Sequence, residues 1–341
     1  MEQLLGQTQA ELEKLTTELG MPVFTARQIT DWLYKKKVKT IDAMTNLSLK
    51  WREKLKENHT VGRIDYAEMQ KAEDGTRKYL FPVSNNKFVE TVYIPDKERA
   101  TICISSQVGC KMNCLFCMTG KQKFTSQLSS NEMMNQILSL PECEQLTNFV
   151  FMGMGEPLDN RLELFKTLEI LTADYGLALS PKRITVSTVG VLPELKRLLE
   201  ETHCHIAISL HSPYPEERLS WMPVEKAYPA EKIIELIKQY DFSHQRRISF
   251  EYILFGGLND NRKHALDLVR LLSGIRCRVN LIKYHPIPGV NLPETIVEHM
   301  IPFRDILSSH GIISTIRSSR GEDILAACGM LSTKRQLLNA T

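Results

Sequence analysis

The stretch ATICISSQVGCKMNCLFC, residues 100–117, joins an apolar strand pattern to three closely spaced cysteines. From there onward the chain repeats strand, loop and helix. Amphipathic segments such as LELFKTLEIL, PELKRLLEE and EKIIELIKQY separate the strand-like runs ATICISS, TNFVFMGM, RITVSTV, HIAISL, RISFEYIL, RVNLIKYH and ISTIRS. This alternation predicts an α/β fold in which right-handed helical crossovers join parallel strands, in a barrel or an open sheet.

Polar residues follow several of these strands where each strand ends. In a barrel of parallel strands, the loops at the carboxyl ends carry the chemistry. Any one of these residues would be an ordinary turn or cap if it stood alone, and only their shared edge suggests a site. The residues are Gly155, Glu156, Ser187, Ser209, His211, Asn280 and Lys283.

The three cysteines Cys110, Cys114 and Cys117 lie in the loop beyond the first strand of this pattern. Thiolates are soft metal ligands, and a short loop can wrap three of them around one inorganic core. Three ligands would leave one iron of a four-iron cluster open. Structural zinc is the alternative, because it takes four protein ligands and Cys103 lies nearby as a fourth.

Composition places the chain among ordinary globular proteins. It has 341 residues, of which 43% are hydrophobic and 24% charged. It contains eight cysteines, and no stretch approaches the roughly 20 apolar residues of a membrane span. The start lacks the pattern of a secretory signal, so we expect a cytoplasmic protein without a membrane partner, whose clustered cysteines serve metal or redox chemistry.

The N-terminal region, residues 1–62, is predicted to be a small helical domain. Residues 25–56 carry nine Lys or Arg against three acidic residues, with Trp32, Tyr34 and Trp51 among them. Such a segment suits RNA phosphates and bases, but a solvated helix face has the same pattern. Residues 63–96 are predicted as a β-hairpin linker, residues 97–330 as the core, and residues 331–341 as a tail.

The CxxxCxxC pattern, with Phe116 before its last cysteine, resembles the signature of radical S-adenosylmethionine (radical SAM) enzymes. The ordered blocks CISSQVGCKMNCLFCMTGKQ, FMGMGEPLDN, VSTVGVLP, SLHSPYPEER and RGEDILAACG resemble the RlmN/Cfr family of RNA adenine methyltransferases. The resemblance runs from about Asp74 to Met330 and more weakly through the N-terminal helices. It implies a partial (β/α)6 barrel of radical SAM type with a small N-terminal helical accessory domain. It also implies a 4Fe-4S cluster on the three cysteines and two S-adenosylmethionine molecules per turnover.

The resemblance further implies a separate catalytic role for each of three residues. Cys328 would receive a methyl group from one S-adenosylmethionine, and a radical made from the second would activate that methyl group to add to adenine. Cys103 would resolve the resulting enzyme–RNA intermediate through a transient disulfide with Cys328. Glu90 would accept the proton that leaves the adenine carbon. The residues implied to contact S-adenosylmethionine are Gly155, Glu156, Ser187, Ser209, Leu210, His211 and Asn280.

The implied reaction is methylation of carbon 2 of adenine in 23S rRNA, in the peptidyl-transferase region, and in tRNA next to the anticodon. An external electron donor such as a flavodoxin would serve the cluster, and a monomer is expected. GMGEP and HPIPG resemble the RlmN branch, whereas SLHSPYPEERLSWMP also resembles the Cfr branch, which methylates carbon 8. Other readings are a zinc-bearing RNA-binding protein without catalytic activity and a radical activase that oxidises a protein glycine.

Overall fold

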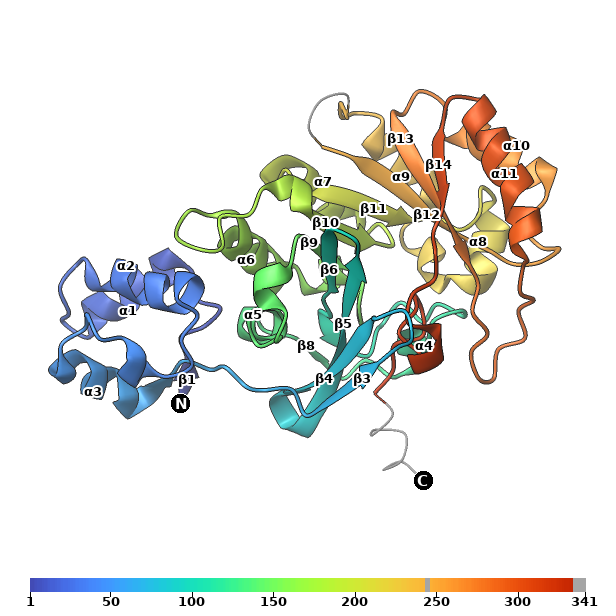
Figure 1. The fold of residues 1–341 in the computed structure, drawn as a ribbon. Helices are drawn as coiled ribbons and strands as arrows, with labels where there is room; N and C mark the ends of the chain where they lie inside the picture. Colours follow the sequence, from blue (N-terminus) through green and yellow to red (C-terminus); the bar gives the residue numbers. More distant parts are fainter. Residues whose placement is uncertain (243–245, 334–341) are drawn as a thin grey trace.

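The computed structural model describes residues 1–242 and 246–333. A small helical unit lies at one end of the molecule (Figure 1) and consists of α1 (Gln9–Glu18), α2 (Thr25–Thr30) and α3 (Leu49–Asn58). Thr8 and Glu11 form a reciprocal cap at the start of α1. The short strands β1 (Glu2–Gln3) and β2 (His59–Thr60) pair in parallel and close the unit.

The helix that begins at α2 extends beyond its α-helical residues. Phe24 is the residue before its first turn, and Thr25 is its first helical residue. The backbone N–H of Thr25 donates to Pro22 O at 2.9 Å, which starts the turn early. The helix then continues as a π-helix over Asp31–Lys35, where its hydrogen bonds reach one residue further back.

The helical unit is fastened to α5 (Ser130–Leu138) by hydrogen bonds between side chains and backbone. Asn131 donates from one amide group to Leu5 O and Gly62 O, each at 3.1 Å. Ser130 Oγ donates to Gly6 O at 2.8 Å. These buried contacts give the unit a defined position on the core.

One ten-stranded mixed sheet forms the centre of the molecule, in the order β14-β13-β12-β11-β10-β9-β6-β5-β4-β3. The four strands from β3 to β6 pair antiparallel, and those from β6 to β14 pair parallel. The antiparallel part comprises β3 (Glu68–Lys71), β4 (Arg77–Val83), β5 (Lys87–Asp96) and β6 (Arg99–Cys103). The parallel part continues with β9 (Asn148–Phe151), β10 (Ile184–Thr188), β11 (His205–Ser209), β12 (Ile248–Leu254), β13 (Cys277–Lys283) and β14 (Ile313–Ile316).

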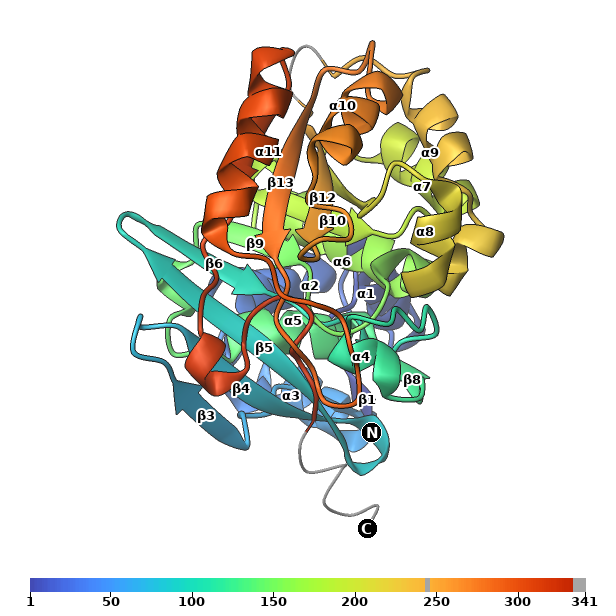
Figure 2. The ribbon, with the colours of Figure 1, turned by 90° about the vertical axis from the view of Figure 1, so that its right-hand side faces the viewer.

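All seven strands expected from the sequence are present, and the α/β fold is confirmed. Helices cover the outer face of the parallel strands (Figures 1 and 2), and the curved sheet stays open between β14 and the antiparallel strands. Six strands correspond to the predicted partial barrel, and β14 adds a seventh at its edge. The helices are α6 (Arg161–Thr172), α7 (Leu192–Glu201), α8 (Pro215–Trp221), α9 (Ala230–Ile237), α10 (Arg262–Leu271) and α11 (Val297–Ser309).

The C-terminal segment, residues 317–333, returns across β4 and β5 beside α4 (Met118–Lys121), as Figure 2 shows. Lys78 Nζ donates to Ile324 O at 2.5 Å, and Met118 N donates to Gly329 O at 2.7 Å. The backbone between β14 and residue 333 is therefore held at several points. Most of the predicted tail, residues 334–341, lies outside the described residues. Within the described residues, no helix is long and apolar enough to cross a membrane.

Candidate active site

The three clustered cysteines line one cavity at the carboxyl ends of the parallel strands. Cys110, Cys114 and Cys117 share a cavity of about 330 Å³ with Cys103 and Cys328. They lie between β7 (Gln107–Val108) and α4, in a loop that Leu115 fastens by donating its N–H to Trp221 O at 2.8 Å. The topology thus brings together sulfur atoms from two distant parts of the chain, residues 103–117 and residue 328.

The donor set fits an iron–sulfur cluster. Burial raises the pKa of Cys110 to about 12 and also raises the pKa of Cys114 and of Cys117. Cys117 adds to the rise at Cys110, and Cys117 and Cys110 both add to it at Cys114. Three close thiolates without a cation would repel one another, whereas a bound metal centre favours the deprotonated form. Among residues 1–242 and 246–333, no three His, Cys, Asp or Glu side chains are grouped to hold a single ion. An iron–sulfur cluster takes its thiolates on separate irons, so its cysteines do not have to converge on one point.

Gly155 and Glu156 form the loop after β9. Gly155 has φ +100°, and a Cβ there would lie 2.5 Å from the Gln107 side chain, so only glycine fits. The Glu156 carboxylate accepts hydrogen bonds from Val189 N at 2.9 Å and Leu158 N at 3.0 Å. Burial raises its pKa to about 7, and these hydrogen bonds oppose the rise. Glu156 therefore ties the β9 loop to the β10 loop at the cavity wall.

His211 follows β11 in a left-handed conformation with φ +63°. Its Nδ1 accepts a hydrogen bond from Ile253 N at 3.1 Å. Its ring packs edge to face against the Phe116 ring, with 4.9 Å between the ring centroids. Burial, and then Arg218, lower its pKa to about 3. His211 is thus a neutral imidazole, and it positions the aromatic residue that precedes Cys117.

The remaining predicted cofactor contacts divide into two groups. Ser187 and Ser209 line the cavity, as do Gly155, Glu156 and His211. Leu210 is buried outside the lining, and its carbonyl accepts from Arg218. Asn280 also lies outside the lining, where it donates to Glu251 at 2.7 Å and accepts from Thr315 at 2.8 Å. A direct role for Leu210 or Asn280 in cofactor binding stays a prediction.

Cys103 and Cys328 both line the cavity, together with the residues that follow β14. Both are free thiols, Cys103 buried and Cys328 exposed. Burial raises the pKa of Cys103 to about 12, Cys328 adds to the rise, and Arg317 opposes it. Arg317 donates to Glu251 at 3.3 Å and lines the same cavity. Sequence reasoning missed this cation, although it lies within the strand-like run ISTIRS, one residue after the observed end of β14.

Glu90 is buried on β5 and lies outside the cavity lining. Its carboxylate pairs with Lys78 at 3.2 Å and accepts from Ser332 N at 2.8 Å. The same lysine holds Ile324 O, so Lys78 and Glu90 together fasten both sides of the segment that carries Cys328. Glu90 therefore acts on the cavity indirectly, because it holds the C-terminal segment that carries Cys328.

Arg218, on α8, is a second residue that sequence reasoning missed. Its side chain is fully buried and pairs with Glu225. The guanidinium also donates to carbonyl groups of two cavity loops, Val189 O at 3.0 Å and Ser209 O at 3.2 Å. Its place in SLHSPYPEER suggests a surface helix, and nothing in its spacing reveals the loops it joins.

Comparisons with known proteins agree with this fold and site. A family model described as the Radical SAM superfamily matches residues 104–270, which span the cysteine loop and the first parallel strands. A second, described as the ribosomal RNA large subunit methyltransferase N-terminal domain, matches residues 2–61. The fold and site are thus those of a radical SAM enzyme with a dedicated N-terminal domain.

Full-length relatives narrow the class further. The chain is 61% identical to the probable dual-specificity RNA methyltransferase RlmN of Parabacteroides distasonis, over 98% of each chain. It is 42% identical to the dual-specificity RNA methyltransferase RlmN of Syntrophus aciditrophicus, covering 95% of this chain and 94% of that one. A crystal structure of a radical SAM methyltransferase from Sphaerobacter thermophilus superposes with a TM-score of 0.91 at 37% identity, covering 97% and 99%. The chain belongs to the RlmN family of dual-specificity RNA methyltransferases.

Proposed function

We propose that this enzyme methylates carbon 2 of adenine in 23S rRNA and in tRNA through a methyl group carried on Cys328. The observation that carries the proposal is that Cys328 and Cys103 line the same cavity as the three proposed cluster cysteines. Carbon 2 of adenine is a poor nucleophile without a lone pair, so a polar transfer of the methyl group is unfavourable. When bound, the cluster and S-adenosylmethionine supply the radical chemistry that this carbon requires.

The protein's own residues supply the remaining steps. The Cys328 thiolate would attack the methyl carbon of the first S-adenosylmethionine, release S-adenosylhomocysteine and become a thioether. Loss of one hydrogen atom to the radical made from the second lets this methyl carbon bond to carbon 2. The adduct would then give one electron back to the bound cluster and lose the proton of carbon 2, for which Glu90 is the proposed acceptor. Cys103 attacks the Cys328 sulfur, which breaks the sulfur–carbon bond, leaves a disulfide, and requires one proton to complete the RNA methyl group.

The position of Glu90 adds a conformational requirement to this scheme. Its carboxylate holds Ser332 N and Lys78, and it does not line the cavity. To receive a proton from RNA, the C-terminal segment must shift and release Ser332. The same shift would carry Cys328 between the cluster and the adenine, so the two motions are coupled in our proposal.

The N-terminal unit is the proposed RNA-binding domain, and the structure refines which lysines suit a test. Lys37 pairs with Glu144 of the core, and Lys36 pairs with Asp31. Replacing these two would also disturb the packing of the domain. Lys35 is exposed and has no ion pair with any described residue. We expect Lys35→Gln to weaken RNA binding and reduce its salt dependence, whereas an unchanged affinity would contradict the assignment.

Three further assignments belong to the same proposal. A flavodoxin-like protein donates the electron to the cluster, each reaction uses two S-adenosylmethionine molecules, and the enzyme acts as a cytoplasmic monomer. The expected turnover can be counted directly. For each methyl group found on RNA, one 5′-deoxyadenosine and one S-adenosylhomocysteine should accumulate, and a ratio with either product missing would contradict the two-molecule scheme.

The decisive experiment identifies the product nucleoside. Cluster-bearing enzyme, reductant and S-adenosylmethionine are incubated with 23S rRNA fragments and with tRNA, and the digested RNA is analysed by mass spectrometry against 2-methyladenosine and 8-methyladenosine. The proposal predicts 2-methyladenosine from both RNAs and none from Cys328→Ala. The carbon 8 product would assign the chain to Cfr-like chemistry, and no product from iron-loaded enzyme would favour a binding role.

A further inference from the structure

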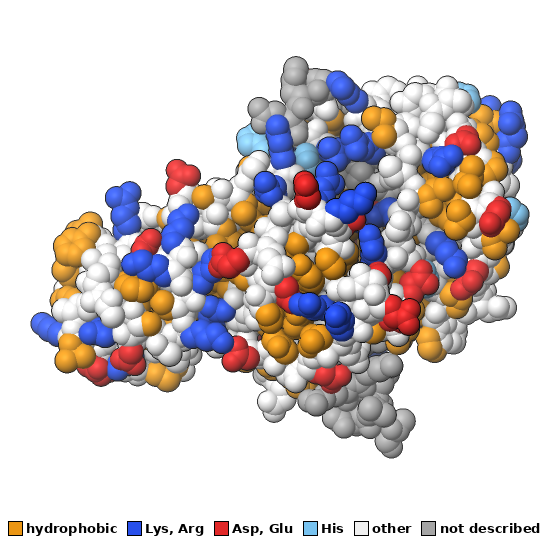
Figure 3. Space-filling model, in the orientation of Figure 1, with side chains coloured by type: hydrophobic (Ala, Val, Ile, Leu, Met, Phe, Trp, Pro, Cys, Tyr) orange, Lys and Arg blue, Asp and Glu red, His pale blue; other side chains and the backbone are white. Residues whose placement is uncertain are grey.

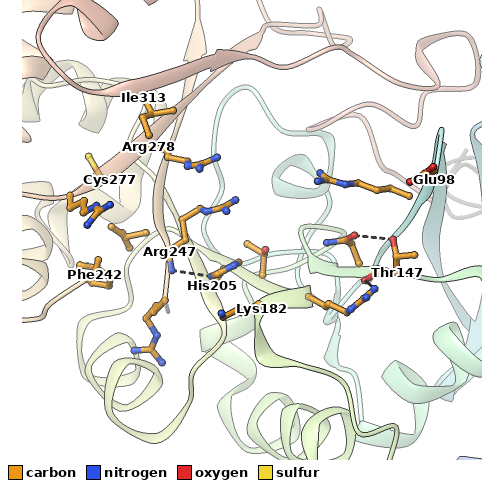
Figure 4. Close-up of a pocket in the computed structure, with 16 residues that line it drawn as sticks. Glu98, Thr147, Lys182, His205, Phe242, Arg247, Cys277, Arg278 and Ile313 are labelled. Carbon is orange, nitrogen blue, oxygen red and sulfur yellow. Dashed lines mark hydrogen bonds between the residues drawn. The ribbon is translucent and has the colours of Figure 1, made fainter. Parts of the chain in front are cut away.

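A second cavity, of about 770 Å³, lies at the opposite end of the barrel, where the parallel strands begin. Seven Lys or Arg residues line it and Glu98 is the single acid. In Figure 3, Lys and Arg side chains gather around a hollow in the upper part of the molecule. In Figure 4, Arg247 and Arg278 point into the same open space, with Lys182 and His205 at its edge. None of these residues serves the chemistry proposed above.

Strand register explains why these cations face inward. Successive residues of a strand point to opposite faces, so residues two apart share a face. On β6, Arg99 therefore shares the face of Cys103, which lines the catalytic cavity. Arg278 lies on β13 four residues before Ile282, which also lines that cavity. Arg99 and Arg278 thus lie in the lowest inward layer of the barrel, about 13 Å below Cys103 and Ile282 at about 3.3 Å per residue.

Four of the cations have no partner for their charged groups. The side chains of Arg99, Lys182, Arg247 and Arg278, here termed the basic ring, make no hydrogen bond or ion pair with any described residue. By contrast, Arg183 donates to Thr147 O at 3.1 Å and Arg246 to Leu199 O at 2.5 Å. The basic ring therefore has no visible role in holding the fold.

The ring cations also repel one another. Burial lowers the pKa of Arg247, and Arg278 and Arg99 lower it further. Burial, followed by Arg247, lowers the pKa of His205 to about 4. Like charges held together without a counter-charge destabilise the fold, and a bound anion removes that cost. Arg99, Lys182 and Arg247 are exposed and Arg278 is half-buried, so water screens part of this repulsion and a bound anion would remove the rest.

The residue types indicate which anion. Guanidinium groups present planar pairs of donors that match phosphate oxygens. Phe242 is buried and is the only Phe, Tyr or Trp among the described residues that line the cavity, so these residues offer little surface for base stacking. Its volume exceeds the space that one phosphate needs. The ligand should therefore carry several phosphate groups, recognised through their charge.

We propose that the basic ring is a second phosphate-binding site, which holds backbone phosphates of the RNA substrate away from the reacting adenine. The identity of that RNA rests on the proposed function. A free polyphosphate presents the same chemistry to the ring, so the experiment includes both sources. Contact at both ends of the barrel would let the enzyme favour a large folded RNA over a short fragment that reaches only the catalytic cavity.

The test compares Arg247→Gln/Arg278→Gln with Lys196→Gln/Lys232→Gln, which removes equal charge from the exposed outer helices α7 and α9. Equilibrium binding of tRNA to the cluster-bearing proteins is measured between low and moderate salt. Each lost phosphate contact should reduce the slope of log K against log salt by about 0.7–0.9. We therefore expect the ring variant to lower the slope by about 1.5 and low-salt affinity by about tenfold or more, with the control unchanged.

A parallel titration uses inorganic tripolyphosphate and follows heat and thermal unfolding. One outcome is that wild type binds tripolyphosphate and the ring variant does not, while both bind tRNA equally. That outcome would identify a free polyphosphate as the ligand and would still support the phosphate site. Equal tRNA slopes together with no tripolyphosphate binding would overturn the proposal. The charge-keeping variant Arg247→Lys/Arg278→Lys controls for folding and should retain part of the binding. Because no turnover is required, an enzyme that binds RNA through the ring yet fails to methylate it would count only against the proposed function.

Discussion

Arg218 offers a quantitative test of how the catalytic loops are held. Its guanidinium is fully buried, pairs with Glu225, and donates to carbonyl groups of the loops after β10 and β11. The variant Arg218→Met keeps similar volume but removes every donor. It leaves Glu225, 4% exposed, as a buried carboxylate without its cation. Breaking a buried pair from one side in this way costs about 3–5 kcal/mol of folding free energy.

The double variant Arg218→Met/Glu225→Gln separates two contributions. Glutamine keeps an acceptor for Ala230 N, which donates to Glu225 at 3.0 Å, but carries no charge. The double variant should therefore regain at least about 2 kcal/mol of the stability lost in the single variant, because no uncompensated charge remains. The loop carbonyls stay unanchored in both, so weakened S-adenosylmethionine binding should persist.

Urea unfolding of the cluster-free proteins, followed by circular dichroism, measures stability, and calorimetry on the cluster-bearing proteins measures S-adenosylmethionine affinity. We expect both variants to bind at least about tenfold more weakly than wild type, which corresponds to about 1.4 kcal/mol. A single variant that loses less than about 1 kcal/mol of stability would refute the buried-charge argument. Wild-type affinity in the double variant would refute the positioning role of Arg218.

Further predictions concern the cavity itself. Burial raises the pKa of Glu156 to about 7, so its carboxyl group is neutral below that pH and ionised above it. Calorimetry should therefore show that binding of the S-adenosylmethionine ammonium strengthens as pH rises through 7. Glu156→Gln should flatten this pH profile. Cys103→Ala should accumulate a covalent Cys328–RNA conjugate visible on denaturing gels, and free methylated RNA at the wild-type rate would contradict its resolving role. Arg317→Gln removes the cation that lowers the pKa of Cys103, so release of methylated RNA should slow about tenfold near neutral pH and recover at higher pH. An unchanged pH profile would contradict this assignment.

Much of the architecture follows from patterns that are local in sequence. Strands of alternating or apolar residues between amphipathic helices predicted the parallel sheet, and a run of seven residues such as β12, buried on both faces, is typical of it. The cysteine spacing predicted one loop that presents three thiols to a common cavity, because all three lie within eight residues. Local spacing also placed Ser187, Ser209 and His211 at one edge.

Contacts between distant segments could not be read in this way. Glu90 and Ser332 are 242 residues apart, and no pattern at either position indicates that they meet. The basic ring collects single cations from the starts of strands as far apart as β6 and β13, and each cation alone resembles a solvated strand end. From the sequence, Arg218 lies on an ordinary amphipathic helix, and only the packing of α8 shows that its side chain is fully buried. Such sites depend on tertiary packing, which periodicity does not encode.

The mass of the tryptic peptide containing Cys328 tests the central claim most directly. Protein produced with iron and purified without oxygen is compared with Cys110→Ala, which lacks one cluster ligand, and with Cys204→Ala, which replaces a buried cysteine outside the cavity. The account predicts a methyl group on Cys328 in wild type and Cys204→Ala, and an unmodified peptide in Cys110→Ala. An unmodified Cys328 in wild-type protein that carries its cluster would contradict the methyl-carrier mechanism.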